Sequence, residues 1–166
     1  MPNEPHILLA SSNMVRLINN LAGALTPVQI ARLRLIVRQQ VIVLFHFGEE
    51  HYKFAKKLST KSWRQKVSRY YYGAFNVSRA VRLEVRGEYS TDVSDHRKFE
   101  NLPDDFPNKN TYVNQLNNLR LDRNLCDYDH TATIDDLLLE LPQTEAMVSE
   151  FLRDSRAYLL VRGVKV

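Results

Sequence analysis

One segment constrains the fold of this chain more than any other: residues 63–86, where core-type side chains recur every three or four positions. That spacing is the period of an α-helix that buries one face. Gly87 follows at the place where such a helix commonly ends, because glycine tolerates the left-handed backbone of the C′ position. Residues 63–86 are therefore predicted to form one long amphipathic helix. The repeating positions are Trp63, Val67, Tyr70, Tyr71, Ala74, Val77, Ser78, Val81 and Val85.

The sequence predicts the start of another helix nearer the N-terminus, at Thr26 and Pro27. Thr26 offers a side-chain oxygen for an N-cap, and Pro27 occupies the first helical position, where a missing backbone N–H costs little. The apolar pattern that follows continues to about residue 47, and Gly48 is expected to end or bend the helix there. A further helical pattern then runs to about Leu58.

The C-terminal half predicts two more helices after a long connection. Residues 88–110 contain several helix breakers and are predicted to be mostly irregular, with a short helix around residues 95–102. A helical pattern then spans residues 112–128. The last pattern starts at Ile134, and a kink is expected at Pro142 because proline lacks the backbone N–H of the helical hydrogen bond.

No segment alternates apolar and polar residues with the period of a β-strand. The predicted fold class is therefore all-α: an antiparallel up-and-down bundle of four main helices over residues 48–166, with an N-terminal helical extension over residues 1–47. A chain of 166 residues is long enough for one core, and its five Gly and six Pro are too few for a loop-rich protein. We expect a single globular unit.

Cysteine usage and hydropathy bear on the compartment. Cys126 is the single cysteine, so neither an internal disulfide nor a cysteine-based zinc site is available. The N-terminal residues lack the basic region of a secretory signal. The longest apolar run, residues 41–45, is far shorter than the roughly 20 residues that cross a bilayer. We expect a cytoplasmic protein with no membrane association.

Positive charge is concentrated in one part of the chain. Residues 53–86 contain ten Lys or Arg and one acid, Glu84, which gives +9; the net charge of the whole chain is +4, so the remainder carries −5. Such a segment is typical of a protein that binds a polyanion such as RNA or DNA. The alternative is a solvated helical face that the acidic C-terminal third neutralises.

Two faces of the predicted helix over residues 63–86 have different roles. Tyr70 and Tyr71 fall on the core face and are expected to pack. Tyr72 falls on a second face, where it could stack on a base or simply pack. That second face is rich in arginine and lacks acids, which favours phosphate contact over simple exposure. Its members are Ser68, Tyr72, Phe75, Arg79, Arg82 and Arg86.

A polar stripe follows in the helix over residues 112–128. Arg123 and His130 are seven positions apart, which places them within roughly 20° around a helix axis if the helix continues that far. Arg120 and Asp127 continue the stripe, and Asn124 lies at its edge. The simplest reading is a surface stripe with an Arg–Asp pair worth only a few tenths of a kcal/mol.

The stripe also has a specific chemistry. An imidazole exchanges a proton near neutral pH, and a guanidinium holds two phosphate oxygens in a fixed fork. Together they suit attack of an RNA 2′-hydroxyl on its own phosphate, with His130 handling the proton and Arg123 stabilising the charge on the phosphorane. This chemistry requires no metal and no cofactor.

Two motifs in this order resemble the HEPN domain family. The first is the Tyr-Tyr-x-x-Phe run at residues 71–75, and the second is Arg123, the polar Asn124 and His130 after a six-residue spacer. The Asp127-Tyr128 pair is similar to one common in a prokaryotic branch of the family. The resemblance covers roughly residues 48–162. It implies a helical bundle that dimerises so that two Arg/His pairs face one cleft.

The resemblance also implies a function. Many members are metal-independent endoribonucleases of toxin–antitoxin, defence or RNA-processing systems that leave a 2′,3′-cyclic phosphate, whereas others only bind nucleotides, RNA or a nucleotidyltransferase partner. In toxins paired with a nucleotidyltransferase, a modified Tyr commonly stands where this chain has Ala132. The expected catalytic residues are Arg123 and His130, with Asn124 and Asp127 as orienting neighbours. The expected RNA contacts are Tyr72, Arg79, Arg82, Arg86 and Arg120.

Two other constellations favour structural roles. His46 and His51 flank two glutamates but are five apart and on different helix faces, so no metal site is expected. Cys126 is four residues from His130, but it continues the apolar register of its helix and is expected to be a buried thiol. A DNA-binding protein ranks last among the functions, since no recognition-helix unit is present.

Overall fold

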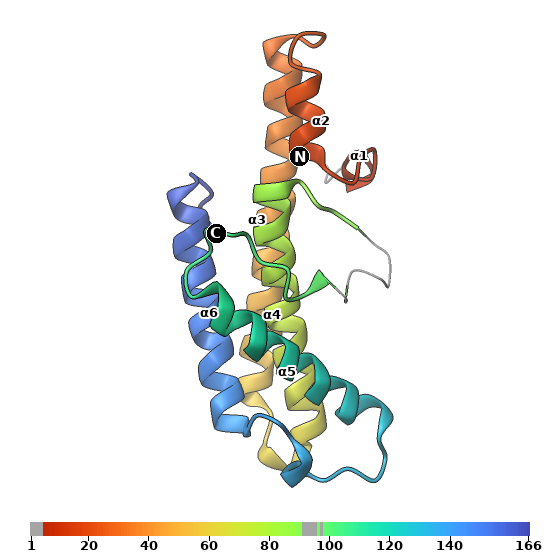
Figure 1. Cartoon of the computed structure of the whole chain (residues 1–166), viewed down its shortest axis with the longest axis vertical. Helices are drawn as coiled ribbons and strands as arrows, with labels where there is room; N and C mark the ends of the chain where they lie inside the picture. The colour runs from red at the N-terminus through yellow and green to blue at the C-terminus, as the bar shows by residue number, and fades with distance from the viewer. Residues whose placement is uncertain (1–4, 91–95, 97) are drawn as a thin grey trace.

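The computed structural model describes residues 5–90, 96 and 98–166, and in these residues the regular secondary structure is helical, without a β-strand. The expected all-α class is therefore confirmed. Two short helices, α1 (Pro5–Leu8) and α2 (Met14–Asn20), precede four long ones (Figure 1). The long helices are α3 (Pro27–Lys57), α4 (Trp63–Arg86), α5 (Lys109–Tyr128) and α6 (Leu141–Val161), with 3-10 turns η1 (Thr60–Ser62) and η3 (Ile134–Asp136).

The centre of the molecule is the hairpin of α3 and α4, which lie side by side along the long axis (Figure 1). The two helices approach closely at Gly48 and Gly73, both buried. A Cβ added to Gly48 would lie 2.7 Å from the Gly73 carbonyl oxygen and 2.7 Å from Cγ2 of Val77. The expectation that the helix ends at Gly48 is therefore wrong: α3 is continuous through this residue, and the boundary expected between residues 47 and 48 falls inside the helix.

The N-terminal part of α3 begins as expected. The Thr26 side chain accepts a hydrogen bond from the Gln29 backbone, and the Gln29 side chain accepts one from the Thr26 backbone, which forms a capping box. Helix α2 packs beside this part of α3 (Figure 1). Its first residue, Met14, donates its backbone N–H to the carbonyl of Gly87 at 2.9 Å.

Gly87 ends α4 with a φ of 64°, which confirms the expected C-terminal glycine. A Cβ at this position would lie 2.3 Å from the backbone nitrogen of Val15. Glycine is therefore required at position 87 for two reasons: the left-handed backbone and the close approach of α2. This contact joins the N-terminal residues to the end of α4.

Helix α5 crosses the α3–α4 hairpin obliquely, and α6 runs along the other side of α4 (Figure 1). Asp122 of α5 is buried and accepts hydrogen bonds from the backbone nitrogens of Leu138 at 2.7 Å and Leu139 at 3.0 Å. Burial raises the pKa of this carboxyl, and the two backbone donors oppose that rise. Asp122 thereby attaches the segment before α6 to α5.

Two expectations about the C-terminal half need correction or remain open. Pro142 lies in the first turn of α6 and does not kink it, because the helix begins at Leu141 and not at Ile134. The short helix expected over residues 95–102 includes positions 95 and 97, which lie outside the described residues. Within the described chain, no helix combines the length and the apolar character that a membrane span needs.

Prediction: Gly48→Ala lowers the free energy of unfolding by about 1–3 kcal/mol, the usual cost of overpacking, because its Cβ meets the backbone of α4. Urea unfolding followed by circular dichroism measures the change. Gly23→Ala is the matched control, since a Cβ there meets nothing within 4 Å. An equal effect of the two substitutions would show that the helix contact is not the cause.

Candidate functional site

Arg123 lies in the penultimate turn of α5, on the side that faces α4. Its Nη2 binds Oδ2 of Asp127 at 2.8 Å and donates to the Tyr72 hydroxyl of α4 at 3.1 Å. Its Nη1 donates to Oδ1 of Asn124 at 3.2 Å. The structure therefore brings together four residues that the sequence singled out: Arg123, Asn124, Asp127 and Tyr72.

The guanidinium of Arg123 is largely enclosed by aromatic rings. The ring centroids of Tyr71, Tyr72 and Tyr128 lie 5.6, 5.8 and 5.6 Å from its central carbon, and 17% of the side chain is exposed. Burial alone lowers the pKa of Arg123, but hydrogen bonds to Tyr72 and Tyr128 and the charge of Asp127 more than offset this, so its pKa is raised. Arg123 is a fixed cation under all physiological conditions.

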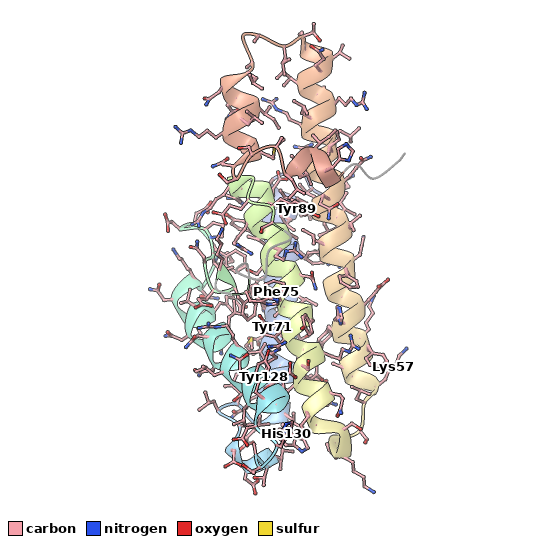
Figure 2. The ribbon with its side chains drawn as sticks, turned by 90° about the vertical axis from the view of Figure 1, so that its right-hand side faces the viewer. Lys57, Tyr71, Phe75, Tyr89, Tyr128 and His130 are labelled. Atoms are coloured by element: carbon pink, nitrogen blue, oxygen red, sulfur yellow. The ribbon has the colours of Figure 1, made fainter. Side chains whose placement is uncertain are left out.

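His130 is placed differently from the expectation of one continuous helical stripe. Helix α5 ends at Tyr128, and His130 lies in the loop just beyond it, with an exposed side chain (Figure 2). Among the described residues no hydrogen bond joins this imidazole to Arg123. His130 is therefore near the same end of α5 as Arg123 but is positioned by the loop and not by the helix.

The loop that carries His130 is held by Arg64, from the first turn of α4. The guanidinium of Arg64 donates to the carbonyl oxygens of Cys126 at 2.9 Å, Asp129 at 2.6 Å and Ala132 at 2.6 Å. A cation on these carbonyls also complements the negative end of α5. Sequence patterns give no sign of this role, because Arg64 is more than 60 positions from the atoms it binds.

A local turn supports the same loop from within. One carboxylate oxygen of Asp129 accepts hydrogen bonds from the backbone and hydroxyl of Thr131, at 2.9 and 2.7 Å, and from the backbone of Ala132 at 3.2 Å. These hydrogen bonds, led by that of the Thr131 hydroxyl, lower the pKa of Asp129. The residues on both sides of His130 are thus fixed by a turn and by Arg64, while its own side chain stays exposed.

The expected RNA contacts on α4 do not form a free arginine face. Arg82 is 1% exposed and lies in the core, where its Nη1 donates to Glu88 at 3.3 Å, so the expectation that it meets RNA is wrong for this conformation. Arg79 donates to the Ser90 carbonyl at 2.6 Å, and Arg86 to the Leu102 carbonyl at 3.2 Å. Both are partly exposed.

Arg120 is also engaged, by Asn117 at 2.7 Å and by Glu100 at 3.4 Å, and is partly exposed. These arginines attach the connection after α4 to the bundle. Loops supply most of their partners, and periodicity within α4 gives no information about them.

The tyrosines of α4 divide as expected between packing and surface. Tyr70 and Tyr71 are buried, and their hydroxyls contact Glu145 and Nδ1 of His96 respectively. Burial raises the pKa of both phenols. Tyr72 is partly exposed, and its ring centroid is 5.6 Å from that of His51.

A hollow of about 270 Å³ lies beside Arg123, between the first half of α4 and the last turn of α5. We call it the α4–α5 pocket. Cys126 contributes to its wall, but its thiol is buried, and burial raises its pKa to about 12, as expected for a structural cysteine and not a nucleophile. The lining residues are Arg64, Gln65, Ser68, Arg69, Tyr72, Cys126 and Asp127.

Metal ligands are not grouped in the described part of the chain: no three His, Cys, Asp or Glu side chains there converge on a common point. His46 instead contacts Glu49 at 3.1 Å within α3. Comparisons of the chain with protein-family models, with curated proteins and with solved structures find no match.

Prediction: Arg64→Ala increases amide hydrogen exchange in residues 129–133 and destabilises the fold by about 1–3 kcal/mol, because three carbonyls lose a charged donor. Arg64→Lys rescues this only in part, since an ammonium lacks the planar fork. Lys61→Ala, an exposed change in η1, is the control. If Arg64→Ala left the exchange of residues 129–133 unchanged, Arg64 would not be the residue that holds this loop.

Prediction: Arg82→Ala costs about 3 kcal/mol of unfolding free energy, because it leaves a cavity in the core and removes the nearer of the two arginines that pair with Glu88. The exposed Arg34→Ala is the control and stays within about 0.5 kcal/mol. Urea denaturation measures both. If Arg82→Ala were as mild as its control, Arg82 would instead belong to an accessible surface.

Proposed function

We propose that this chain is a metal-independent endoribonuclease of the HEPN type, with Arg123 and His130 as its catalytic residues. The observation that carries the proposal is that a fixed guanidinium and an exposed imidazole both lie at the C-terminal end of α5. Arg123 is a permanently charged guanidinium fixed by Asp127 and Tyr72, and His130 is an exposed imidazole on a loop that Arg64 holds. A fixed cation and a free proton carrier at one helix end suit phosphodiester cleavage.

The reaction assigned to this pair is an internal transesterification. His130 accepts the proton of the RNA 2′-hydroxyl as its oxygen forms a bond to the adjacent phosphorus. The bond from phosphorus to the 5′-oxygen of the next nucleotide breaks, and that oxygen takes up a proton from water. The products are a 2′,3′-cyclic phosphate and a 5′-hydroxyl, and the charge that develops on the phosphorane is stabilised by Arg123.

Asp127 and Asn124 orient the guanidinium before the substrate arrives. Nη1 is bonded to the neutral Asn124 amide oxygen at 3.2 Å, the weaker of its contacts, whereas Nη2 faces Asp127 at 2.8 Å. A phosphate oxygen displaces the neutral amide more readily than the carboxylate. Nη1 is therefore the edge of Arg123 proposed to bind phosphate, with Asp127 and Tyr72 retained as supports.

The proposal includes a homodimer, because one chain supplies one Arg/His pair and the HEPN resemblance implies two pairs across one cleft. It also includes the up-and-down arrangement of the four long helices. An antitoxin or a nucleotidyltransferase is the proposed regulatory partner, and the cytoplasm the proposed compartment. Ala132 lacks the hydroxyl that such a nucleotidyltransferase modifies, so control by that modification is not part of the proposal.

A second candidate is a non-catalytic module that binds a nucleotide or RNA in the same place. The observation that favours it is the engagement of Arg123: its charge is already balanced by Asp127, and no hydrogen bond links it to His130 in the described residues. A binding module needs the cation and the pocket but not the proton carrier.

Prediction: in the presence of a chelator, the purified chain cleaves labelled RNA, and His130→Ala slows cleavage by about 10²–10⁴-fold, the usual contribution of a general acid–base. His130 is exposed, so its removal leaves the fold intact. His6→Ala, another exposed histidine, is the control and keeps full activity. Equal cleavage by wild type and His130→Ala, or none by either, contradicts the proposal.

A further inference from the structure

The α4–α5 pocket is next to the groups assigned to catalysis. Two of its lining residues, Tyr72 and Asp127, are the partners of Arg123, at 3.1 and 2.8 Å from Nη2. A third, Arg64, holds the loop that carries His130. A phosphate bound at Nη1 of Arg123 therefore lies on the same guanidinium whose Nη2 contacts two residues of the pocket wall.

The volume of the pocket limits what it holds. At about 270 Å³ it is below the roughly 300–1,000 Å³ of pockets that enclose whole drug-sized ligands. One nucleobase suits such a space better than a dinucleotide. The partly exposed ring of Tyr72 offers a surface for stacking, and the guanidinium of Arg69, exposed over the ring of Phe54 at 5.3 Å, offers a cationic rim.

The polar atoms of the wall select among bases. Arg123 occupies Oδ2 of Asp127, and no described residue donates to Oδ1. An ionised carboxylate only accepts hydrogen bonds, so it favours a base edge with an amino group. Adenine, cytosine and guanine have such a group, whereas uracil presents two carbonyl oxygens beside its single N–H and is repelled. Gln65 and Ser68 offer further donors and acceptors.

We infer that the α4–α5 pocket is a base-recognition subsite, which takes one amino-bearing nucleobase next to the scissile phosphate and rejects uracil. The inference rests on the proposed ribonuclease, whose site it extends. Asp127 thereby has two functions, holding Arg123 through one oxygen and reading the base through the other. Gln65 and Ser68, polar lining residues outside the catalytic groups, hold the base edge against Asp127, so their loss weakens the selection.

The test is cleavage of a random-sequence single-stranded RNA pool, with sequencing of the bases on both sides of each cut. The wild type is expected to disfavour uridine at one flanking position by about tenfold, the discrimination that one good base contact provides. Gln65→Ala and Ser68→Ala are expected to reduce this to under threefold. Gln115→Ala, on α5 outside the pocket, is the matched control and keeps the preference.

Absence of a uridine bias in the wild type, or a bias unchanged in both pocket variants, overturns the inference even if cleavage depends on His130. If no His130-dependent cleavage occurs, the proposed function fails, and base binding is then measured directly. Trp63, the single tryptophan, stacks on Arg64 at 4.7 Å and reports on the pocket wall by fluorescence. Equal affinity for adenosine, cytidine, guanosine and uridine 3′-monophosphates, or no binding of any, overturns the inference.

Discussion

The contact between Gly48 and Gly73 is the constraint on which the rest of this structure depends. A Cβ on Gly48 would overlap the backbone of α4, and a Cβ on Gly73 would lie a tight 3.2 Å from the Gly48 carbonyl oxygen, so glycine at these positions lets α3 and α4 approach closely. The hairpin in turn provides the surface on which α5 and α6 pack. Its second helix also carries Tyr72 and Arg64, so the geometry around Arg123 and His130 depends on the same contact.

Around this hairpin, arginines mainly hold the structure together. Arg82 bonds to Glu88, Arg79 and Arg86 bond to carbonyls of the connection after α4, and Arg64 bonds to carbonyls after α5. Long, forked donors suit this purpose, because irregular segments expose carbonyl groups that no helix satisfies. The excess of positive charge in residues 53–86 is therefore partly used within the fold, and Arg64 and Arg69 at the α4–α5 pocket are the part nearest the candidate site.

The sequence predicted features that depend on neighbouring residues better than features that depend on residues far apart in the chain. Local signals succeeded: the cap at Thr26, the terminal Gly87 and the packing of Tyr70 and Tyr71 are all present. The helix end expected at Gly48 was wrong because tertiary packing outweighs a helix penalty of about 1 kcal/mol for glycine. A helical period gives the faces of α4 but not what covers them, so the burial of Arg82 and the role of Arg64 required the three-dimensional structure.

Helical periodicity alone does not determine where His130 lies relative to Arg123, because α5 ends between them. A shorter spacer would keep both side chains on regular helix, at a fixed separation. Here α5 ends at Tyr128, so the position of His130 depends on Asp129 within the loop and on Arg64 from α4. Tertiary hydrogen bonds thus replace helical geometry in holding the backbone on both sides of His130. Because His130 lies beyond the helix, the backbone around it is held from elsewhere in the chain, and Arg64 supplies that contact.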